Sequence, residues 1–309
     1  MPKSTHRVAV VDVGTNSARL LVADVAGGRV SPVERRSTVT RLGRGVDLSG
    51  RLSAEAIEDA CAAIGDYVAL YKELKAETVE AIATSAVRDA ENGSAFVAEL
   101  RERFALSARV LDGEEEARLT YLGATSEHRP TEPTLVVDIG GGSTELIVGT
   151  GEEISFRASL QAGVVRHSER HIATDPPTVL ELETLAADIR GLIEPAIAGG
   201  VEAKAGIAVA GTPTSLAAIE LELEPYDPAR VHGHVLSLTS IQRMLSQLAS
   251  TPLSERVEIP GMHPDRAPTV VAGVVILIET MRAFGLDQIE VSEHDILYGT
   301  ALSAASSRF

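Results

Sequence analysis

One sequence pattern occurs twice in this chain. Residues 10–22 read VVDVGTNSARLLV, and residues 136–148 read VVDIGGGSTELIV, a constant 126 residues further along. In both copies an Asp ends a short apolar run, glycine and small polar residues follow, and a second apolar run begins. This pattern predicts a strand, a tight loop and a second strand. The repetition indicates two related halves built around the same hairpin.

Further elements are expected around these hairpins. Gly27-Gly28 predicts a turn into a third strand over residues 30–38. Ser53 begins a helix that extends to Lys75, because an acidic first turn and apolar residues at helical spacing follow it. The other predicted helices are 94–104, 113–122, 177–197, 214–220, 240–249, 266–284 and 296–305, and the other predicted strands are 78–84, 108–111, 206–210 and 288–291. Hairpins combined with crossover helices, twice in 309 residues, predict a two-domain α/β protein.

Composition excludes several classes of protein. The net charge of −16 argues against non-specific binding to nucleic acid. Cys61 is the single cysteine, which excludes internal disulfides and cysteine-built zinc sites. The longest apolar run, Val270 to Ile278, is too short to span a membrane, and the N-terminus does not resemble a signal peptide. We therefore expect a cytoplasmic protein without nucleic-acid or membrane partners.

Asp12 and Asp138 each follow a strand and precede a glycine loop. A loop of this kind can bind phosphate oxygens through its backbone N–H groups, and the Asp can bind Mg2+ beside them. Two hairpin turns with capping Asp residues are the alternative interpretation. The matched repetition favours phosphate binding.

Other polar segments allow two interpretations each. Arg88 follows a predicted strand and is either a phosphate ligand or a surface residue at a helix start. The acidic run Glu114–Glu116 is favoured by the helix dipole alone, but one of its members could be a general base for water. The loop at Gly211-Thr212 either closes over a substrate or caps a helix. His232 with His234, and the His294-Asp295 pair, lack further metal ligands at a recognisable spacing.

These motifs together resemble the exopolyphosphatase / guanosine pentaphosphatase (Ppx/GppA) family of the actin–sugar kinase–chaperone ATPase superfamily. The resemblance covers nearly the whole chain. The two phosphate loops of the family look like residues 12–17, with Arg19, and residues 138–145. An acidic family element is similar to residues 112–117, where Asp112 stands in place of the usual Ser. Residues 264–267, 291–293 and Gly299 also resemble family elements.

The resemblance implies two actin-like (ribonuclease H-like) domains with an active-site cleft between them. The first domain would be residues 1–128, completed by a C-terminal helix at about 300–309, and the second residues 129–299. It implies that Glu115 or Glu116 is the catalytic base, and that Asp138 takes part in catalysis. Asp12, Asp138 and Glu145 are the implied ligands of Mg2+ or Mn2+. The implied phosphate-binding residues are Asp12, Gly14, Thr15, Asn16, Ser17, Arg19, Arg88, Gly140, Gly141, Gly142, Ser143, Thr144, Gly211, Thr212 and Arg266.

The expected activity is that of an exopolyphosphatase, which hydrolyses the terminal phosphoanhydride of inorganic polyphosphate and releases orthophosphate. Longer family members have additional C-terminal helical domains, so we expect this chain to prefer short polyphosphate. Hydrolysis of guanosine pentaphosphate is the nearest alternative, although aromatic residues that could stack on guanine are only 3% of the chain. A kinase of the same superfamily and a non-catalytic polyphosphate- or nucleotide-binding regulator are further alternatives. The resemblance also implies a homodimer.

Overall fold

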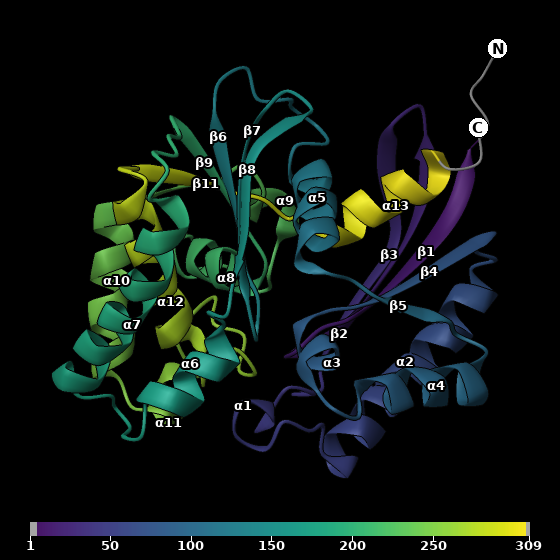
Figure 1. The fold of residues 1–309 in the computed structure, drawn as a ribbon, viewed down its shortest axis with the longest axis horizontal. Coiled ribbons are helices and arrows are strands. Elements are labelled where there is room, and N and C mark those ends of the chain that lie inside the picture. Colours follow the sequence, from purple (N-terminus) through teal and green to yellow (C-terminus); the bar gives the residue numbers. More distant parts are fainter. Residues whose placement is uncertain (1–4, 307–309) are drawn as a thin grey trace. The chain divides into compact units, whose positions relative to one another are not determined.

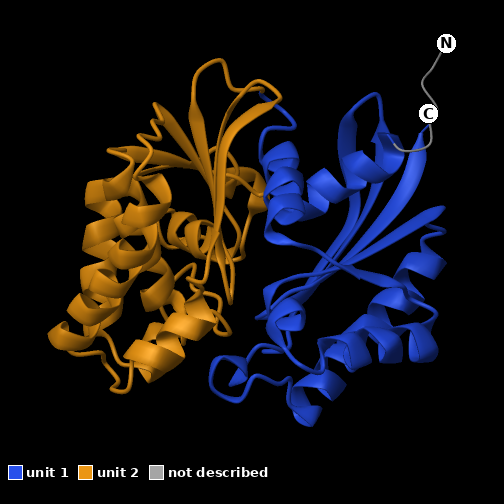
Figure 2. Cartoon of the chain, in the orientation of Figure 1, with its two compact units in different colours: residues 1–128, 294–309 blue, residues 129–293 orange. Residues whose placement is uncertain are grey.

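The computed structural model describes residues 5–306 of the chain. It divides them into two compact units, which Figure 2 shows in separate colours. Unit 1 contains the chain up to residue 128 and again from residue 294, and unit 2 contains residues 129–293. The C-terminal segment of unit 1 therefore begins earlier than residue 300. The part of that segment at residues 307–309 lies outside the described residues.

Unit 1 is built on a five-stranded sheet with the order β3-β2-β1-β4-β5 (Figure 1). The strands are β1 (His6–Val13), β2 (Ser17–Ala26), β3 (Arg29–Val39), β4 (Thr78–Ala83) and β5 (Ala108–Val110). The first three form antiparallel hairpins, whereas β4 and β5 run parallel to β1. This is the ribonuclease H-like order.

Helices cover both faces of this sheet because β1 is apolar on both sides. Ala9 and Val11 pack in one core with α2 (Ala54–Glu73) and α4 (Gly93–Phe104). Val8 and Val10 face the other way and pack against α13 (Ile296–Ser306), which contacts α5 (Gly113–Ala124). The short helices of this unit are α1 (Val46–Ser49) and α3 (Ser85–Asp89). Strand alternation thus gives each face of the sheet its own core.

Unit 2 repeats the arrangement with one extra edge strand, in the order β10-β11-β9-β6-β7-β8. Its strands are β6 (Thr134–Ile139), β7 (Thr144–Thr150), β8 (Glu153–Leu160), β9 (Ala205–Val209), β10 (Val235–Ser237) and β11 (Gln288–Val291). β6, β7 and β8 form antiparallel hairpins. β9 pairs in parallel with β6, and β11 pairs in parallel with β9. The predicted α/β fold with two actin-like halves is confirmed.

A long buried helix organises the core of unit 2. This helix, α12 (Val270–Ala283), is buried at every position from Val270 to Met281 and contacts α6, α7, α8 and α10. The other helices of the unit are α6 (Val164–His171), α7 (Val179–Ile197), α8 (Gly211–Glu220), α9 (Pro228–Val231), α10 (Leu238–Ser250) and α11 (Leu253–Arg256). Within residues 5–306, no helix combines the length and apolar character needed to cross a membrane.

Two expectations about helices in unit 2 need correction. The helix predicted over 266–284 begins only at Val270, and the preceding residues form turns. The helix α6 has no counterpart in the prediction. Its sequence is apolar at Val164 and Val165 and then polar, so it lacks the long apolar periodicity that identifies a helix. The first turn of α6 is stabilised instead by hydrogen bonds from Val164 N and Val165 N to carbonyls of the glycine loop after β6.

Candidate active site

The loop between β1 and β2 is a closed turn with little freedom. Gly14 N donates a hydrogen bond of 3.1 Å to Ser17 O. A Cβ at Gly14 would lie 2.8 Å from the same oxygen, so this position admits only glycine. The side chain of Thr15 accepts a hydrogen bond from Ala86 N, and Asn16 O accepts bonds from the segment after β3. The predicted phosphate-binding residues 14–17 therefore form a rigid, largely buried loop.

Asp12 and Arg19 face each other across the β1–β2 hairpin. Asp12 Oδ2 accepts hydrogen bonds from Arg19 Nε and Nη2 at 2.8 and 2.6 Å. Arg19 also forms an ion pair with Asp295, which lies just before α13. Family resemblance predicts that Arg19 is a phosphate ligand, and the structure places its guanidinium between two buried carboxylates. The role of Asp295 was missed because it is 276 residues from Arg19 and no local pattern connects them.

The second oxygen of Asp12 has a different environment. Oδ1 is buried and makes no hydrogen bond to any described residue. Burial raises the pKa of the Asp12 carboxyl, although the charge and hydrogen bonds of Arg19 act in the opposite direction. An oxygen of this kind is suited to bind a cation or to accept a hydrogen bond from water.

The three consecutive glutamates at the start of α5 point in different directions. Asp112 caps the helix by accepting a 2.8 Å hydrogen bond from Glu115 N. Glu115 is partly exposed and forms an ion pair with Arg109, whereas Glu116 is only 6% exposed. The side chain that faces the interior of unit 1 is thus that of Glu116.

Glu116 is held by Arg88, which follows β4. Arg88 Nη1 donates to Glu116 Oε2 at 2.7 Å and to Leu111 O at 2.9 Å. Burial raises the pKa of Glu116, the Arg88 interaction lowers it, and the negative charges of Asp12 and Asp89 raise it further. The structure therefore brings Asp12, Arg88 and Glu116 into one electrostatic neighbourhood. A buried carboxylate with a raised pKa and a fixed orientation is suited to accept a proton.

The loop between β6 and β7 repeats the turn of unit 1. Gly140 N donates to Ser143 O at 3.0 Å, as Gly14 donates to Ser17. The start of α6 supports this loop, since Val164 N and Val165 N donate to the carbonyls of Gly140 and Gly141, each at 2.9 Å. The side chain of Thr144 also donates, to Ala162 O at 2.5 Å. These bonds fix the predicted phosphate-binding segment 140–144.

Asp138 and Glu145 lie opposite each other across this hairpin, at the positions equivalent to Asp12 and Arg19. Directly opposed residues of antiparallel strands project from the same face. Both side chains are buried, and Ser159 Oγ on the neighbouring β8 donates to Glu145 Oε1 at 2.9 Å. Two carboxylates on one face fit Mg2+ or Mn2+, which prefer oxygen ligands, and a cation would offset their mutual repulsion. The oxygen donors of Asp138 and Glu145 are thus suited to a cation.

Three more predicted residues of unit 2 lie together at the start of α8. The guanidinium of Arg266 packs on the backbone of Gly211, where an added Cβ would lie 2.2 Å from Nη1. Thr212 is buried against α12, where a Cβ on Gly273 would lie 2.2 Å from Thr212 Oγ1. Gly211, Thr212 and Arg266 therefore form one packed group.

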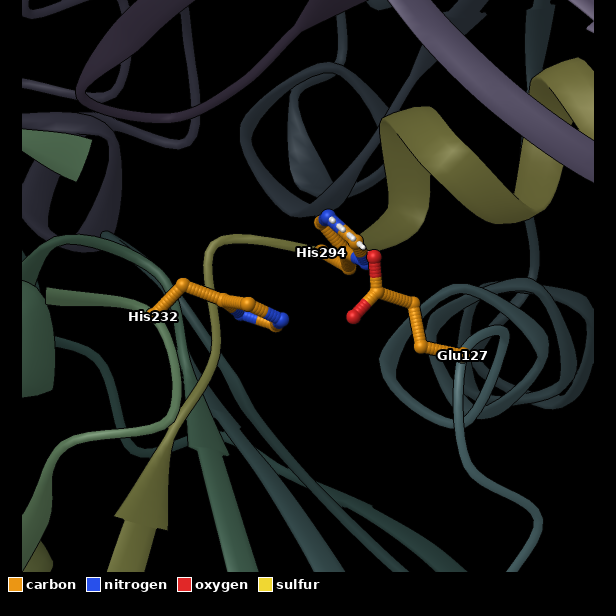
Figure 3. A group of neighbouring side chains, drawn as sticks. All are labelled: Glu127, His232 and His294. Carbon is orange, nitrogen blue, oxygen red and sulfur yellow. Dashed lines mark ion pairs between the residues drawn. The ribbon is translucent and has the colours of Figure 1, made fainter. Parts of the chain in front are cut away.

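The remaining histidine motifs divide among separate partners. His234 Nε2 lies 2.7 Å from Glu220 Oε2, whereas His232 Nδ1 accepts a hydrogen bond from Glu293 N. In unit 1, His294 Nε2 lies 4.0 Å from Glu127 Oε1 (Figure 3).

A cavity of about 500 Å³ lies beside His294 in unit 1 and is lined by the turn between β2 and β3 and by the residues after α5. That turn, at Gly27-Gly28, is at the opposite end of β2 from Ser17. The cavity is therefore not part of the phosphate loop.

Comparisons with known proteins agree with this geometry. The model of the Ppx/GppA phosphatase family matches residues 21–305. A protein of Mycobacterium tuberculosis named exopolyphosphatase 2 is 38% identical, and the match covers 97% of this chain and 98% of that protein. The crystal structure of the Aquifex aeolicus Ppx/GppA family member has a TM-score of 0.85, with 31% identity and 99% of each chain covered. An exopolyphosphatase structure from Cytophaga hutchinsonii has a TM-score of 0.88 at 26% identity and covers 96% of this chain and 98% of that one. On this evidence the chain belongs to the Ppx/GppA phosphatase family.

Proposed function

We propose that the protein is an exopolyphosphatase, which hydrolyses the terminal phosphoanhydride of inorganic polyphosphate and releases orthophosphate. The observation that carries the proposal is the environment of Glu116, a buried carboxylate that Arg88 orients beside the Asp12 phosphate loop. The exopolyphosphatase names of two relatives support the choice of substrate.

In the proposed reaction Glu116 accepts a proton from water. The water oxygen attacks the terminal phosphorus, the bond to the bridging oxygen breaks, and the shortened polyphosphate leaves with the electron pair of that bond. Arg88 keeps the Glu116 carboxylate ionised and oriented, because its hydrogen bond favours the charged form. Burial acts against this and moves the pKa of Glu116 closer to neutral pH, where a base is most effective.

Phosphate binding is assigned to both glycine loops. From the sequence repeat, we infer that the loop at residues 14–17 and the loop at residues 140–144 each bind phosphate through their N–H groups. Asp138 and Glu145 would hold the metal in this scheme, and Mg2+ bound there would supply positive charge that stabilises phosphoryl oxygens. Arg19 keeps Asp12 in place, because its guanidinium is already engaged by two carboxylates.

Phosphate release from a panel of substrates tests the function. Short polyphosphate, long polyphosphate, guanosine pentaphosphate and ATP are assayed side by side with Mg2+. We expect the highest kcat/KM on polyphosphate and loss of release on chelation. The ratio of the rates on short and long chains tests the predicted preference for short chains. Preferential release from the guanosine compound would replace the proposal with its nearest alternative, and binding without any release would indicate a regulator.

The predicted homodimer is tested separately. Sedimentation of the full chain in the assay buffer measures its mass, which for one subunit is 32.5 kDa. A species of twice this mass is expected, and a single-subunit mass would contradict the expectation.

A further inference from the structure

Unit 2 contains a cluster of metal-binding side chains that the proposed reaction does not use. His167 and His171 lie one helical turn apart on α6, and Asp188 lies on the neighbouring α7. His171 Nε2 is 2.8 Å from Asp188 Oδ2, and His167 Nε2 is 3.4 Å from the same oxygen. One ligand atom from each of the three residues lies within 4.8 Å of the other two.

These separations match the dimensions of a transition-metal site. Bonds of about 2.0–2.1 Å to His nitrogen and carboxylate oxygen, arranged as a tetrahedron, place neighbouring ligand atoms about 3.3 Å apart. The distance from His167 Nε2 to Asp188 Oδ2 is 3.4 Å, and the shorter distance from His171 needs only a small rotation. Two imidazoles and one carboxylate favour Zn2+ and similar ions over Mg2+, which prefers oxygen ligands.

His167 supplies an independent sign of a missing ligand. Its side chain is fully buried, and Nε2 makes no hydrogen bond to any residue of the described chain although it faces Asp188. Its other nitrogen, Nδ1, lies 3.3 Å from Gly163 O and 3.3 Å from Gly163 N. In the tautomer that carries its proton on Nδ1, this nitrogen donates to the Gly163 carbonyl and the lone pair of Nε2 is available to a metal. A metal-binding histidine is commonly fixed in this way, by a hydrogen bond from its second nitrogen to a carbonyl.

We propose that His167, His171 and Asp188 bind one divalent transition-metal ion of the Zn2+ type, distinct from the ion assigned to Asp138 and Glu145. The ion would join α6 to α7, with a fourth position left for water. The first residues of α6, Val164 and Val165, hold the carbonyls of the second phosphate loop. The bound metal would therefore fix α6 against α7 and keep Val164 and Val165 in contact with the second phosphate loop.

One neighbouring charge distinguishes a metal site from a simple ion-pair network. Arg170 Nη1 lies 3.5 Å from Asp188 Oδ2 and competes with a cation for that carboxylate. If Asp188 binds a metal ion, the affinity for that ion in Arg170→Ala should equal or exceed that of wild type, because a positive charge that repels the ion is lost. If Asp188 serves only the ion pair, neither wild type nor Arg170→Ala binds a metal at this site.

The test is a titration of the full chain with Co2+ in the presence of excess Mg2+, followed by visible absorption and equilibrium dialysis. Wild-type protein should bind one Co2+, which Zn2+ displaces, and Zn2+ should raise Tm by at least about 3 °C. His171→Ala and Asp188→Asn should each weaken Co2+ binding at least about 100-fold. These variants are preferred to a substitution of His167, whose complete burial endangers folding.

Two control variants complete the design. His263→Ala removes a histidine whose side chain is 65% exposed and which lies outside the cluster, and it should bind Co2+ like wild type. Arg170→Ala should bind Co2+ at least as tightly as wild type. Circular dichroism without metal confirms that each variant is folded. The proposal is overturned if wild type does not bind Co2+ under these conditions, or if folded His171→Ala and Asp188→Asn bind it as wild type does.

Discussion

The assignment of the base to Glu116 predicts that substitutions of two neighbouring glutamates, Glu116 and Glu115, have very different effects on kcat. Glu116→Gln keeps the shape of the side chain and an oxygen that can accept from Arg88, but it removes the group that takes up a proton. General-base catalysis contributes about 100- to 10,000-fold, so kcat should fall by this factor. The fall corresponds to about 2.7–5.4 kcal/mol of transition-state stabilisation. The KM for polyphosphate should change much less than kcat, since Glu116 binds water and not phosphate in this scheme.

Glu115→Gln is the matched control. Glu115 is next to Glu116 in the chain and is partly exposed, and its partner Arg109 is itself 49% exposed. Loss of such a surface ion pair costs about 0–1 kcal/mol of stability and should leave kcat within about twofold of wild type.

Steady-state phosphate release measures both variants, and Tm shows whether each is folded. The reasoning would be refuted by full turnover in Glu116→Gln, by an equal loss in Glu115→Gln, or by a loss that merely tracks unfolding.

Three further predictions concern pH, metal and backbone geometry. Because burial raises the pKa of Glu116, the pH at which kcat/KM falls on acidification should lie above the pKa of an ordinary glutamate. Arg88→Gln should move this fall to a still higher pH, because the interaction that favours the charged form is lost. Identical pH–rate profiles for wild type and Arg88→Gln would contradict this explanation. Glu145→Gln should raise the Mg2+ concentration needed for half-maximal activity at least about tenfold, as measured by Mg2+ titration, and an unchanged requirement would exclude Glu145 as a ligand. Gly163→Ala should destabilise the protein by about 1–3 kcal/mol in urea unfolding, because its Cβ would lie 2.3 Å from a carbonyl oxygen of the phosphate loop. Gly191→Ala is the control, because Gly191 lies on the exposed side of α7 and no atom lies within 4 Å of the new Cβ. The free energy of unfolding of this variant should rise by up to about 1 kcal/mol. Equal effects of the two substitutions would contradict this explanation.

Local sequence signals were sufficient for most of the architecture. The predicted helix start at Ser53 is confirmed, because its side chain caps α2 by accepting a hydrogen bond from Ala56 N. The strand at 288–291 has the predicted bounds. Short apolar runs, apolar residues at helical spacing and capping residues report backbone conformation within a few neighbouring residues, so they identify hairpins and long helices. The same signals missed α6, whose short polar sequence forms a helix where its N–H groups meet the Gly140 loop.

The sequence by itself determined that the chain has two related α/β halves, each with an Asp-glycine loop after its first strand, and that an acidic helix start lies between them. It could not distinguish Glu115 from Glu116, because both follow the same helical cap. Only the tertiary structure shows that their environments differ, since the direction in which α5 packs buries Glu116 and leaves Glu115 partly exposed. It likewise joined Arg19 to Asp295, because the C-terminal segment returns to the first sheet at α13. Burial and long-range pairing depend on how distant elements pack together, and no local pattern in the chain contains that information.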